Sequence, residues 1–242
     1  MYDQKSGLQE RAIKLGFTLT ELQCRQFEEY RSLLLAWNNK MDLTAITEAA
    51  EIDNKHFLDS LSILRFFPEG ISGRVVDIGT GAGFPSIPLK ILNPTMSLTL
   101  VDSLNKRILF LKEVVHTLEL ADVSLFHTRA EDFLQASPEN AHRESYDYVV
   151  ARAVAPLPTL LEYTLPALRI GGELIAMKGP GARQEVEDAK NALAELGGEV
   201  IEIDEFTWTE QQYQRVNLRI RKERPTPNRY PRGKGKAKKR PL

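Results

Sequence analysis

The sequence has little of what marks a secreted, membrane-spanning or metal-bound protein. Its single cysteine, Cys24, excludes an internal disulfide and has no partner at the spacing of a metal site. No apolar run approaches the ~20 residues that a membrane-spanning helix needs, and the first residues lack the apolar core of a secretory signal. We therefore expect a cytoplasmic protein with no membrane association and no metal.

Charge is nearly balanced overall but unevenly distributed. Residues 221–242 hold ten basic residues and one acidic residue, whereas the rest of the chain holds 22 basic and 32 acidic residues. An acidic body with a basic end favours a polyanionic partner reached through that end. A disordered, solubilising end is the alternative that composition leaves open. The stretch PRGKGKAKKRPL has the composition of a mobile segment that cannot pack into a core.

Helical periodicity dominates residues 1–68. Thr20 is placed to cap the second helix. The apolar positions expected to face the core lie at helical spacing in the second and third helices: Leu22, Phe27, Leu33, Leu34, Trp37, Ile52, Phe57, Leu61 and Leu64.

Short apolar strands then alternate with helices. Such alternation predicts a mostly parallel sheet covered by helices on both faces. A helix is expected over 157–170, ended by Gly171 and Gly172, and another over 182–198. The strands are expected at 74–78, 98–102, 123–127, 146–153 and 172–179, followed by an antiparallel pair at 199–208 and 214–222.

The stretch VVDIGTGAGFPSIPLK (75–90) joins a strand to a helix through three glycines. This arrangement is typical of nucleotide binding in doubly wound sheets. A P-loop would need Lys followed by Ser or Thr, but Phe84 and Pro85 follow the last glycine. A dinucleotide fingerprint would need glycine at position 84. The remaining pattern, Asp77 followed by Gly79, Gly81 and Gly83, is similar to that of class I methyltransferases that use S-adenosyl-L-methionine (SAM).

The residue types suit that cofactor. Glycines without a Cβ let a ligand lie close to the main chain. Asp77 supplies a carboxylate near a cationic ligand, and Asp102, at the end of the next strand, can accept hydrogen bonds from both ribose hydroxyls. The alternative is a tight turn between strand and helix that holds no ligand.

Several segments together resemble the bacterial ribosomal RNA small subunit methyltransferase G family, also called glucose-inhibited division protein B. The resemblance runs from about residue 20 into the basic end. It is carried by WNNKMDLTAIT (37–47), KHFLDSL (55–61), DIGTGAGFPSIPLKI (77–91), VDSLNKRILFL (101–111), RAED (129–132), ARAVAPL (151–157) and MKG (177–179).

The resemblance implies a Rossmann-like class I fold with a seven-stranded sheet, an antiparallel last strand and a small N-terminal helical cap. It divides the chain into a cap at 1–70, a SAM-binding domain at 71–222 and a basic flexible tail at 223–242. It also implies transfer of a methyl group from SAM to N7 of one guanosine in 16S rRNA, leaving S-adenosyl-L-homocysteine (SAH). The implied cofactor positions are Gly79, Phe84, Ala130, Glu131 and Arg152.

No catalytic residue is expected. Guanine N7 has a free lone pair, so alignment of the reactants and exclusion of water can suffice. Arg152, Lys178 and His56 are candidates on the substrate side. Their alternatives are a surface ion pair for Arg152, a solvated strand end for Lys178, and, for His56 with Asp59, a pair that fixes its helix to the glycine loop.

The expected partner is 16S rRNA in the small subunit or in an assembly intermediate, bound by a monomer. Lys and Arg in the basic end would contact phosphates without reading sequence. Two other functions stay open. One is a small-molecule methyltransferase, which would not need a polycationic end. The other is a non-catalytic RNA-binding or assembly factor that keeps SAM only as a ligand.

Overall fold

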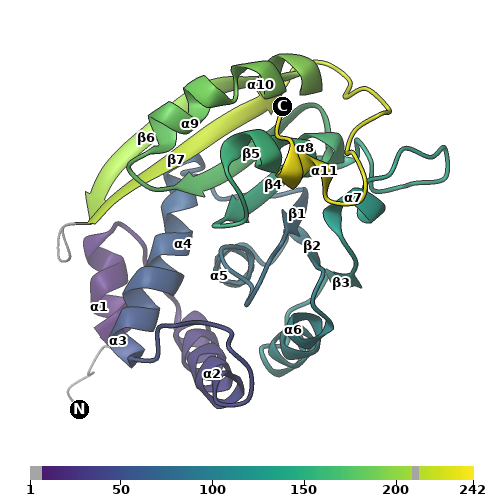
Figure 1. Cartoon of the computed structure of the whole chain (residues 1–242). Helices are drawn as coiled ribbons and strands as arrows, with labels where there is room; N and C mark the ends of the chain where they lie inside the picture. The colour runs from purple at the N-terminus through teal and green to yellow at the C-terminus, as the bar shows by residue number, and fades with distance from the viewer. Residues whose placement is uncertain (1–6, 209–212) are drawn as a thin grey trace, which may run out of the picture.

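Seven strands form one sheet in the order β3-β2-β1-β4-β5-β7-β6. The computed structural model describes residues 7–208 and 213–242 (Figure 1). β7 is antiparallel to both of its neighbours, and the other pairs are parallel. The predicted mostly parallel sheet with an antiparallel last strand is confirmed. The strands are β1 (Arg74–Ile78), β2 (Ser97–Asp102), β3 (Val123–His127), β4 (Tyr146–Arg152), β5 (Leu168–Lys178), β6 (Gly198–Trp208) and β7 (Tyr213–Lys222).

Strand order reverses between β1 and β4. β1 pairs with β2 on one side and with β4 on the other, all in parallel. The carboxyl ends of the parallel strands therefore meet at one edge of the sheet, which is where ligands bind in open α/β sheets. Asp102, Arg152 and Lys178 are each the last residue of their strand and lie at this edge.

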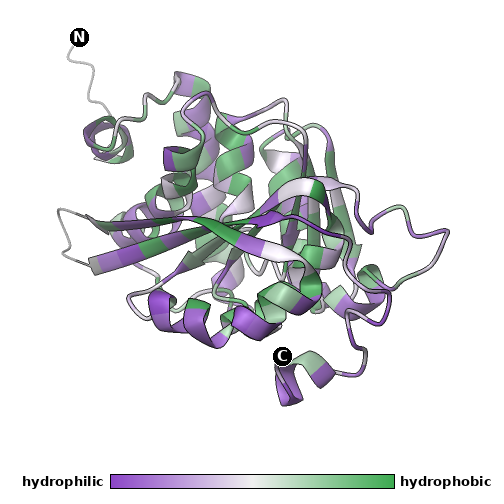
Figure 2. Cartoon of the chain, turned by 90° about the horizontal axis from the view of Figure 1, so that it is seen from above, coloured by the Kyte–Doolittle hydropathy of each residue, from purple (hydrophilic) through white to green (hydrophobic). Residues whose placement is uncertain are grey.

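Helices cover both faces of the sheet, as the view from above shows (Figure 2). Val75 packs in one hydrophobic cluster and its neighbour Val76 in the other, because successive side chains of a strand point to opposite faces. The first cluster joins the sheet to the N-terminal helices, α5 (Ser86–Leu92) and α6 (Asn105–Thr117). The second joins it to α7 (Ala130–Phe133), α8 (Leu157–Thr164), α9 (Ala182–Asp188) and α10 (Lys190–Leu196).

The N-terminal helices share the first cluster with the sheet. Thr20 caps the second helix through a capping box with Gln23, as predicted. Leu22, expected in the core, is 56% exposed; Phe27, Tyr30 and Leu34 form the buried face instead. No described helix is long and apolar enough to cross a membrane. The elements are α1 (Gly7–Lys14), α2 (Glu21–Asn38), α3 (Ala49–Ile52), η1 (Asp53–Leu58), α4 (Asp59–Leu61) and η2 (Ser62–Phe66).

The helix predicted over 157–170 is too long. α8 ends at Thr164, a short turn (η3, Leu165–Ala167) follows, and β5 begins at Leu168. Pro166 has no N–H and cannot continue the helix, and Leu168 instead pairs with the first residue of β4. Gly171, with a φ of +78°, lies inside β5 where the register with β4 shifts.

The single helix predicted over 182–198 is two helices, divided at Ala189.

The C-terminal residues 223–242 pack against the body. Tyr230 is 5% exposed and joins the second hydrophobic cluster, and Ala237 is fully buried. A short helix, α11 (Lys236–Lys239), lies against α8 (Figure 1). The prediction that residues 231–242 cannot pack into a core was wrong, because Ala237 is fully buried. The basic composition gives no sign of the few residues that hold this segment against the body. One of them is Arg232, which forms an ion pair with the buried Glu162.

Candidate functional site

Two adjoining clefts open at the carboxyl edge of the sheet. The first cleft, of about 640 Å³, is lined by Gly79, Asp102, Ala130 and Glu131, among others. The second cleft, of about 850 Å³, is lined by His56, Asp59, Arg152, Lys178 and Glu185, among others. Both volumes lie within the ~300–1,000 Å³ typical of small-molecule sites. Ala153 and Val154 line both clefts, so the loop after β4 separates the two spaces.

The three glycines of the loop after β1 serve different purposes. All three have positive φ, at 78°, 61° and 93° for Gly79, Gly81 and Gly83. A Cβ added at Gly81 would meet nothing within 4 Å, whereas one at Gly79 would lie 3.1 Å from Val154 and one at Gly83 2.8 Å from the Tyr30 hydroxyl. Only Gly81 therefore leaves open space that a ligand could use. The other two glycines make room for protein side chains.

Asp77 lies beneath this loop and is fully buried. Its Oδ2 accepts hydrogen bonds from Ser86 (2.6 Å) and Thr80 (2.9 Å), while its buried Oδ1 has no partner. Burial raises the pKa of this carboxyl to about 7. A buried carboxylate oxygen without a donor is suited to a cationic ligand, directly or through water, and it fits the ammonium group of SAM.

Asp102 ties the end of β2 to the glycine loop. Its Oδ2 accepts a hydrogen bond from the Gly81 N–H at 2.9 Å, and its Oδ1 accepts one from the Leu104 N–H at 2.9 Å. Arg107 forms an ion pair with it at 3.1 Å. Each carboxylate oxygen can accept more than one hydrogen bond. Asp102 therefore keeps acceptor capacity for ribose hydroxyls while it holds Gly81 in place.

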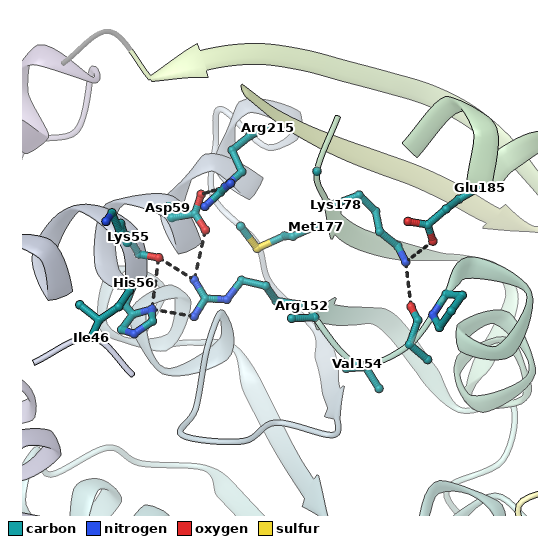
Figure 3. A pocket seen from close by; sticks show the side chains of 14 residues that line it. Ile46, Lys55, His56, Asp59, Arg152, Val154, Met177, Lys178, Glu185 and Arg215 are labelled. Carbon is teal, nitrogen blue, oxygen red and sulfur yellow. Dashed lines mark hydrogen bonds and ion pairs between the residues drawn. The ribbon is translucent and has the colours of Figure 1, made fainter. Parts of the chain in front are cut away.

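Arg152 occupies the wall of the second cleft, with its side chain 16% exposed. It donates to the Lys55 carbonyl (3.0 Å), to Asp59 (3.1 Å) and to His56 Nδ1 (3.1 Å), as Figure 3 shows. Asp59, which is 2% exposed, also forms an ion pair with Arg215 at 2.8 Å. The Arg152 interaction is thus a largely buried ion pair, not the surface pair of the alternative interpretation.

His56 fixes its helix to the residue after the glycines. The His56 ring stacks on the Phe84 ring at 4.6 Å between centroids. The Arg152 guanidinium lies 5.0 Å from the centroid of the Phe84 ring. His56 Nε2 lies 2.8 Å from Thr44 Oγ1. Burial, with the nearby Arg152 charge, lowers the pKa of His56 to about 4. His56 is therefore neutral near pH 7, and its geometry agrees with the role of joining helix to loop.

Lys178 is fixed at the opposite wall of the second cleft. Its Nζ donates to Glu185 (2.7 Å) and to the Ala155 carbonyl (2.8 Å), and its side chain is 10% exposed. Glu185 also accepts a hydrogen bond from the Leu157 N–H. The pair thus holds the loop that follows β4, and Lys178 is not a solvated strand end.

Comparison with known proteins identifies the family. The family model described as rRNA small subunit methyltransferase G matches residues 23–214. The chain belongs to the rRNA small subunit methyltransferase G family.

Relatives in this family match along nearly the whole chain. The Ribosomal RNA small subunit methyltransferase G of Alkaliphilus metalliredigens is 48% identical over 238 residues, covering 98% of this chain and 97% of that protein. The protein of the same name from Desulforamulus reducens is 44% identical over 242 residues and covers both chains completely. The matched length therefore includes the N-terminal helices and the basic end.

Solved structures of low sequence identity share the fold. M. jannaschii TYW2 in complex with AdoMet is 14% identical, with a TM-score of 0.52 over 69% of this chain and 76% of that chain. The ribosomal protein L11 methylase from Lactobacillus delbrueckii subsp. bulgaricus is 21% identical, with a TM-score of 0.50 over 69% of this chain and 77% of that chain. The class I methyltransferase fold expected of a methyltransferase G is confirmed.

In this member of the methyltransferase G family, the residues named by the resemblance divide between the two clefts. Gly79, Ala130 and Glu131 line the first cleft, and Arg152 lines the second. Phe84 is 7% exposed, packs against His56 and Arg152, and is not among the residues that line either cleft. The described residues contain no group of three or more His, Cys, Asp or Glu side chains that could hold a metal ion.

Three residues of the site were missed in the sequence. Tyr30 reaches the glycine loop from α2 and donates a hydrogen bond to the Ala82 carbonyl. Arg215 reaches Asp59 from a position 156 residues away, and Glu185 reaches Lys178 from α9. Tyr30 could have been found from the spacing Phe27, Tyr30, Leu34 on one helix face. No local pattern marks the other two.

Proposed function

We propose that this protein transfers a methyl group from SAM to N7 of a guanosine in 16S rRNA, with SAM in the first cleft and the guanine in the second. The observation that carries the proposal is the open space at Gly81, next to a buried, unpartnered Asp77 oxygen and the Asp102 carboxylate. In this assignment Asp77 lies toward the amino acid part of SAM and Asp102 toward its ribose. Ala130 and Glu131 lie beside the adenine.

The second cleft supports a role in holding the target base. Arg152 and Lys178 face it from the ends of β4 and β5, and both are held by ion pairs (Figure 3). Fixed cations at a cleft suit the O6 oxygen of guanine and nearby phosphates. The separation of the clefts by Ala153 and Val154 makes this loop the boundary across which cofactor and base would meet.

The chain's residues position the reactants and do not need to move a proton. When bound, SAM supplies an electrophilic methyl group, and guanine N7 has a lone pair that can accept it without prior deprotonation. His56 is hydrogen-bonded to Arg152 and stacked on Phe84, so it serves as a positioning residue and not as a base. The protein's contribution is alignment and exclusion of water.

The test uses SAM labelled in its methyl group and small ribosomal subunits from a strain that lacks the gene. Parallel reactions contain naked 16S rRNA, an assembly intermediate or a small-metabolite extract. Label at guanine N7 in 16S rRNA supports the proposal, and comparison of the rRNA forms identifies the preferred substrate. Label only in small metabolites would favour a small-molecule methyltransferase. SAM binding without any label transfer would favour the assembly factor. The proposal includes action as a monomer in the cytoplasm.

A further inference from the structure

The basic C-terminal segment is docked by a buried ion pair. The side chain of Glu162 on α8 is 0% exposed, and Arg232 donates hydrogen bonds to its carboxylate from three nitrogen atoms. The Arg232 backbone N–H donates to Oε1 at 2.6 Å, and the guanidinium donates through Nε (2.9 Å) and Nη2 (2.6 Å). A buried carboxylate is costly unless it is paired in this way, so this contact fixes where the segment lies.

Further contacts hold the residues after Arg232. The Thr159 hydroxyl donates to the Ala237 carbonyl at 3.2 Å, and Ala237 is fully buried. Arg232 Nη2 also donates to the Arg240 carbonyl at 2.9 Å. Residues 232–240 therefore form a closed loop and a helical turn against α8, and are not a tail that leaves the surface.

This loop reaches the first cleft. The Gly235 N–H donates to Glu131 Oε1 at 3.2 Å, and Gly235, Lys238 and Lys239 line the same cleft as Gly79 and Asp102. Gly235 adopts a φ of +66°. Lys238 and Lys239 bring positive charge to a cleft that carries the acidic side chains of Asp102 and Glu131. In Figure 2 the C-terminal helix is mostly hydrophilic, as expected for a wall that faces a solvated ligand.

We infer that residues 232–240 are a wall of the cofactor cleft, closing it at the adenosine end and holding the Glu131 carboxylate in place through the Gly235 N–H. The inference rests on the proposed function, in which this cleft takes SAM. It assigns the basic end a role in binding the adenosine of SAM or SAH, separate from any contact with rRNA phosphates. Because coupling between two binding events is reciprocal, a docked segment strengthens cofactor binding and bound cofactor strengthens docking.

The experiment measures SAH binding by calorimetry with the full chain and two variants. Arg232→Ala removes the docking cation. Arg229→Ala is the matched control, since it removes an arginine of the same segment whose ion pair with Glu195 is exposed, at 65% and 38%. We expect Arg232→Ala to weaken SAH binding at least tenfold and Arg229→Ala to change it less than twofold.

A second measurement stays decisive if Arg232→Ala fails to fold. Hydrogen exchange of the wild-type protein is followed with and without saturating SAH. Slower exchange of the amides of 232–240 with SAH, by threefold or more, is the expected result. If the wild type binds SAH and exchange of these amides is unaffected, the inference is overturned, whether or not Arg232→Ala folds, and the proposed function stands. If the wild type binds neither SAH nor SAM, the proposed function itself fails.

Discussion

At the scale of single residues, Gly81 is the position that a ligand needs empty. Gly81→Asp would place a carboxylate in the open space at this position, beside Asp102, whose carboxylate accepts a hydrogen bond from the Gly81 N–H. We expect the dissociation constant for SAM to rise at least ~100-fold, equivalent to about 2.7 kcal/mol. Calorimetry on the folded variant checks this.

The control for Gly81→Asp is Gly16→Asp. Gly16 also has a positive φ and open space at its Cβ position, but it follows α1 and is not part of the loop between β1 and α5. It should show the cost of backbone strain without loss of SAM binding. Unchanged SAM affinity in Gly81→Asp would contradict the assignment of the glycine loop to SAM binding.

Burial of Asp77 is expected to make the free energy of unfolding depend on pH. Its pKa in the folded protein is raised to about 7, so the neutral carboxyl is favoured. The stability that it contributes is complete below its ordinary pKa and is lost as pH rises through about 7. Urea unfolding of the wild type, relative to Asp77→Asn, should therefore show stability falling by a few kcal/mol between about pH 4 and pH 8.

A bound cation should reverse that preference at Asp77. SAM is expected to favour the ionised carboxylate, so its affinity for the wild type should increase as pH rises from 6 to 8. Asp77→Asn should lack this increase. A wild-type affinity that is independent of pH over this range would argue that Asp77 does not face the cationic part of the ligand.

At the scale of elements, α2 supports the glycine loop. Tyr30→Phe removes the hydrogen bond to the buried Ala82 carbonyl, which should cost about 1–2 kcal/mol of unfolding free energy and weaken SAM binding several-fold. Tyr146→Phe is the control, since Tyr146 is also buried but belongs to the other hydrophobic cluster, and its hydroxyl bonds Thr99 and His142. It should lose similar stability and keep full SAM affinity, and equal binding by both variants would exclude a role for α2 in holding the loop.

The elements themselves were largely predictable where burial is continuous. β1 and β3 begin and end at the predicted residues, because short apolar runs bounded by polar residues and turns are typical of strands in a parallel sheet. The boundary between α8 and β5 was missed because glycines were taken as the end of a helix. They lie inside a strand, in a bulge whose position depends on pairing with β4.

The site was predictable only in part. The glycines and the carboxylates at strand ends follow from local pattern, since each belongs to a recognisable strand and loop. Their partners do not. Gly83 makes room for Tyr30, and Arg232 reaches Glu162 across 70 residues, so both depend on how distant segments fold together. Composition alone therefore gave a wrong prediction of how the basic end packs.

At the scale of the whole molecule, the basic end is expected to contact rRNA as well as to pack. Lys234 and Lys236 are exposed. Replacing both with Gln should make the slope of log affinity against log salt shallower by about 1–2, if each meets one phosphate. Filter binding to 16S rRNA at several salt concentrations measures this.

Arg183→Gln with Lys190→Gln provides the control for the salt experiment. These two cations lie on α9 and α10 in exposed ion pairs with Glu205 and Glu187, away from both clefts. Their replacement should leave the slope unchanged. The same slope for all three proteins would show that the exposed cations of the basic end do not bind the rRNA backbone.

The most direct measurement of the central claim is the N7-methylguanosine content of 16S rRNA in the cell. A strain lacking the gene is complemented with the wild type or with Gly81→Asp, and purified 16S rRNA is digested and analysed by mass spectrometry, with fragments mapped to position. We predict one N7-methylguanosine that is absent in the deletion strain, restored by the wild type and not restored by Gly81→Asp. Full methylation in the deletion strain, or restoration by Gly81→Asp at normal levels of the protein, would contradict the account.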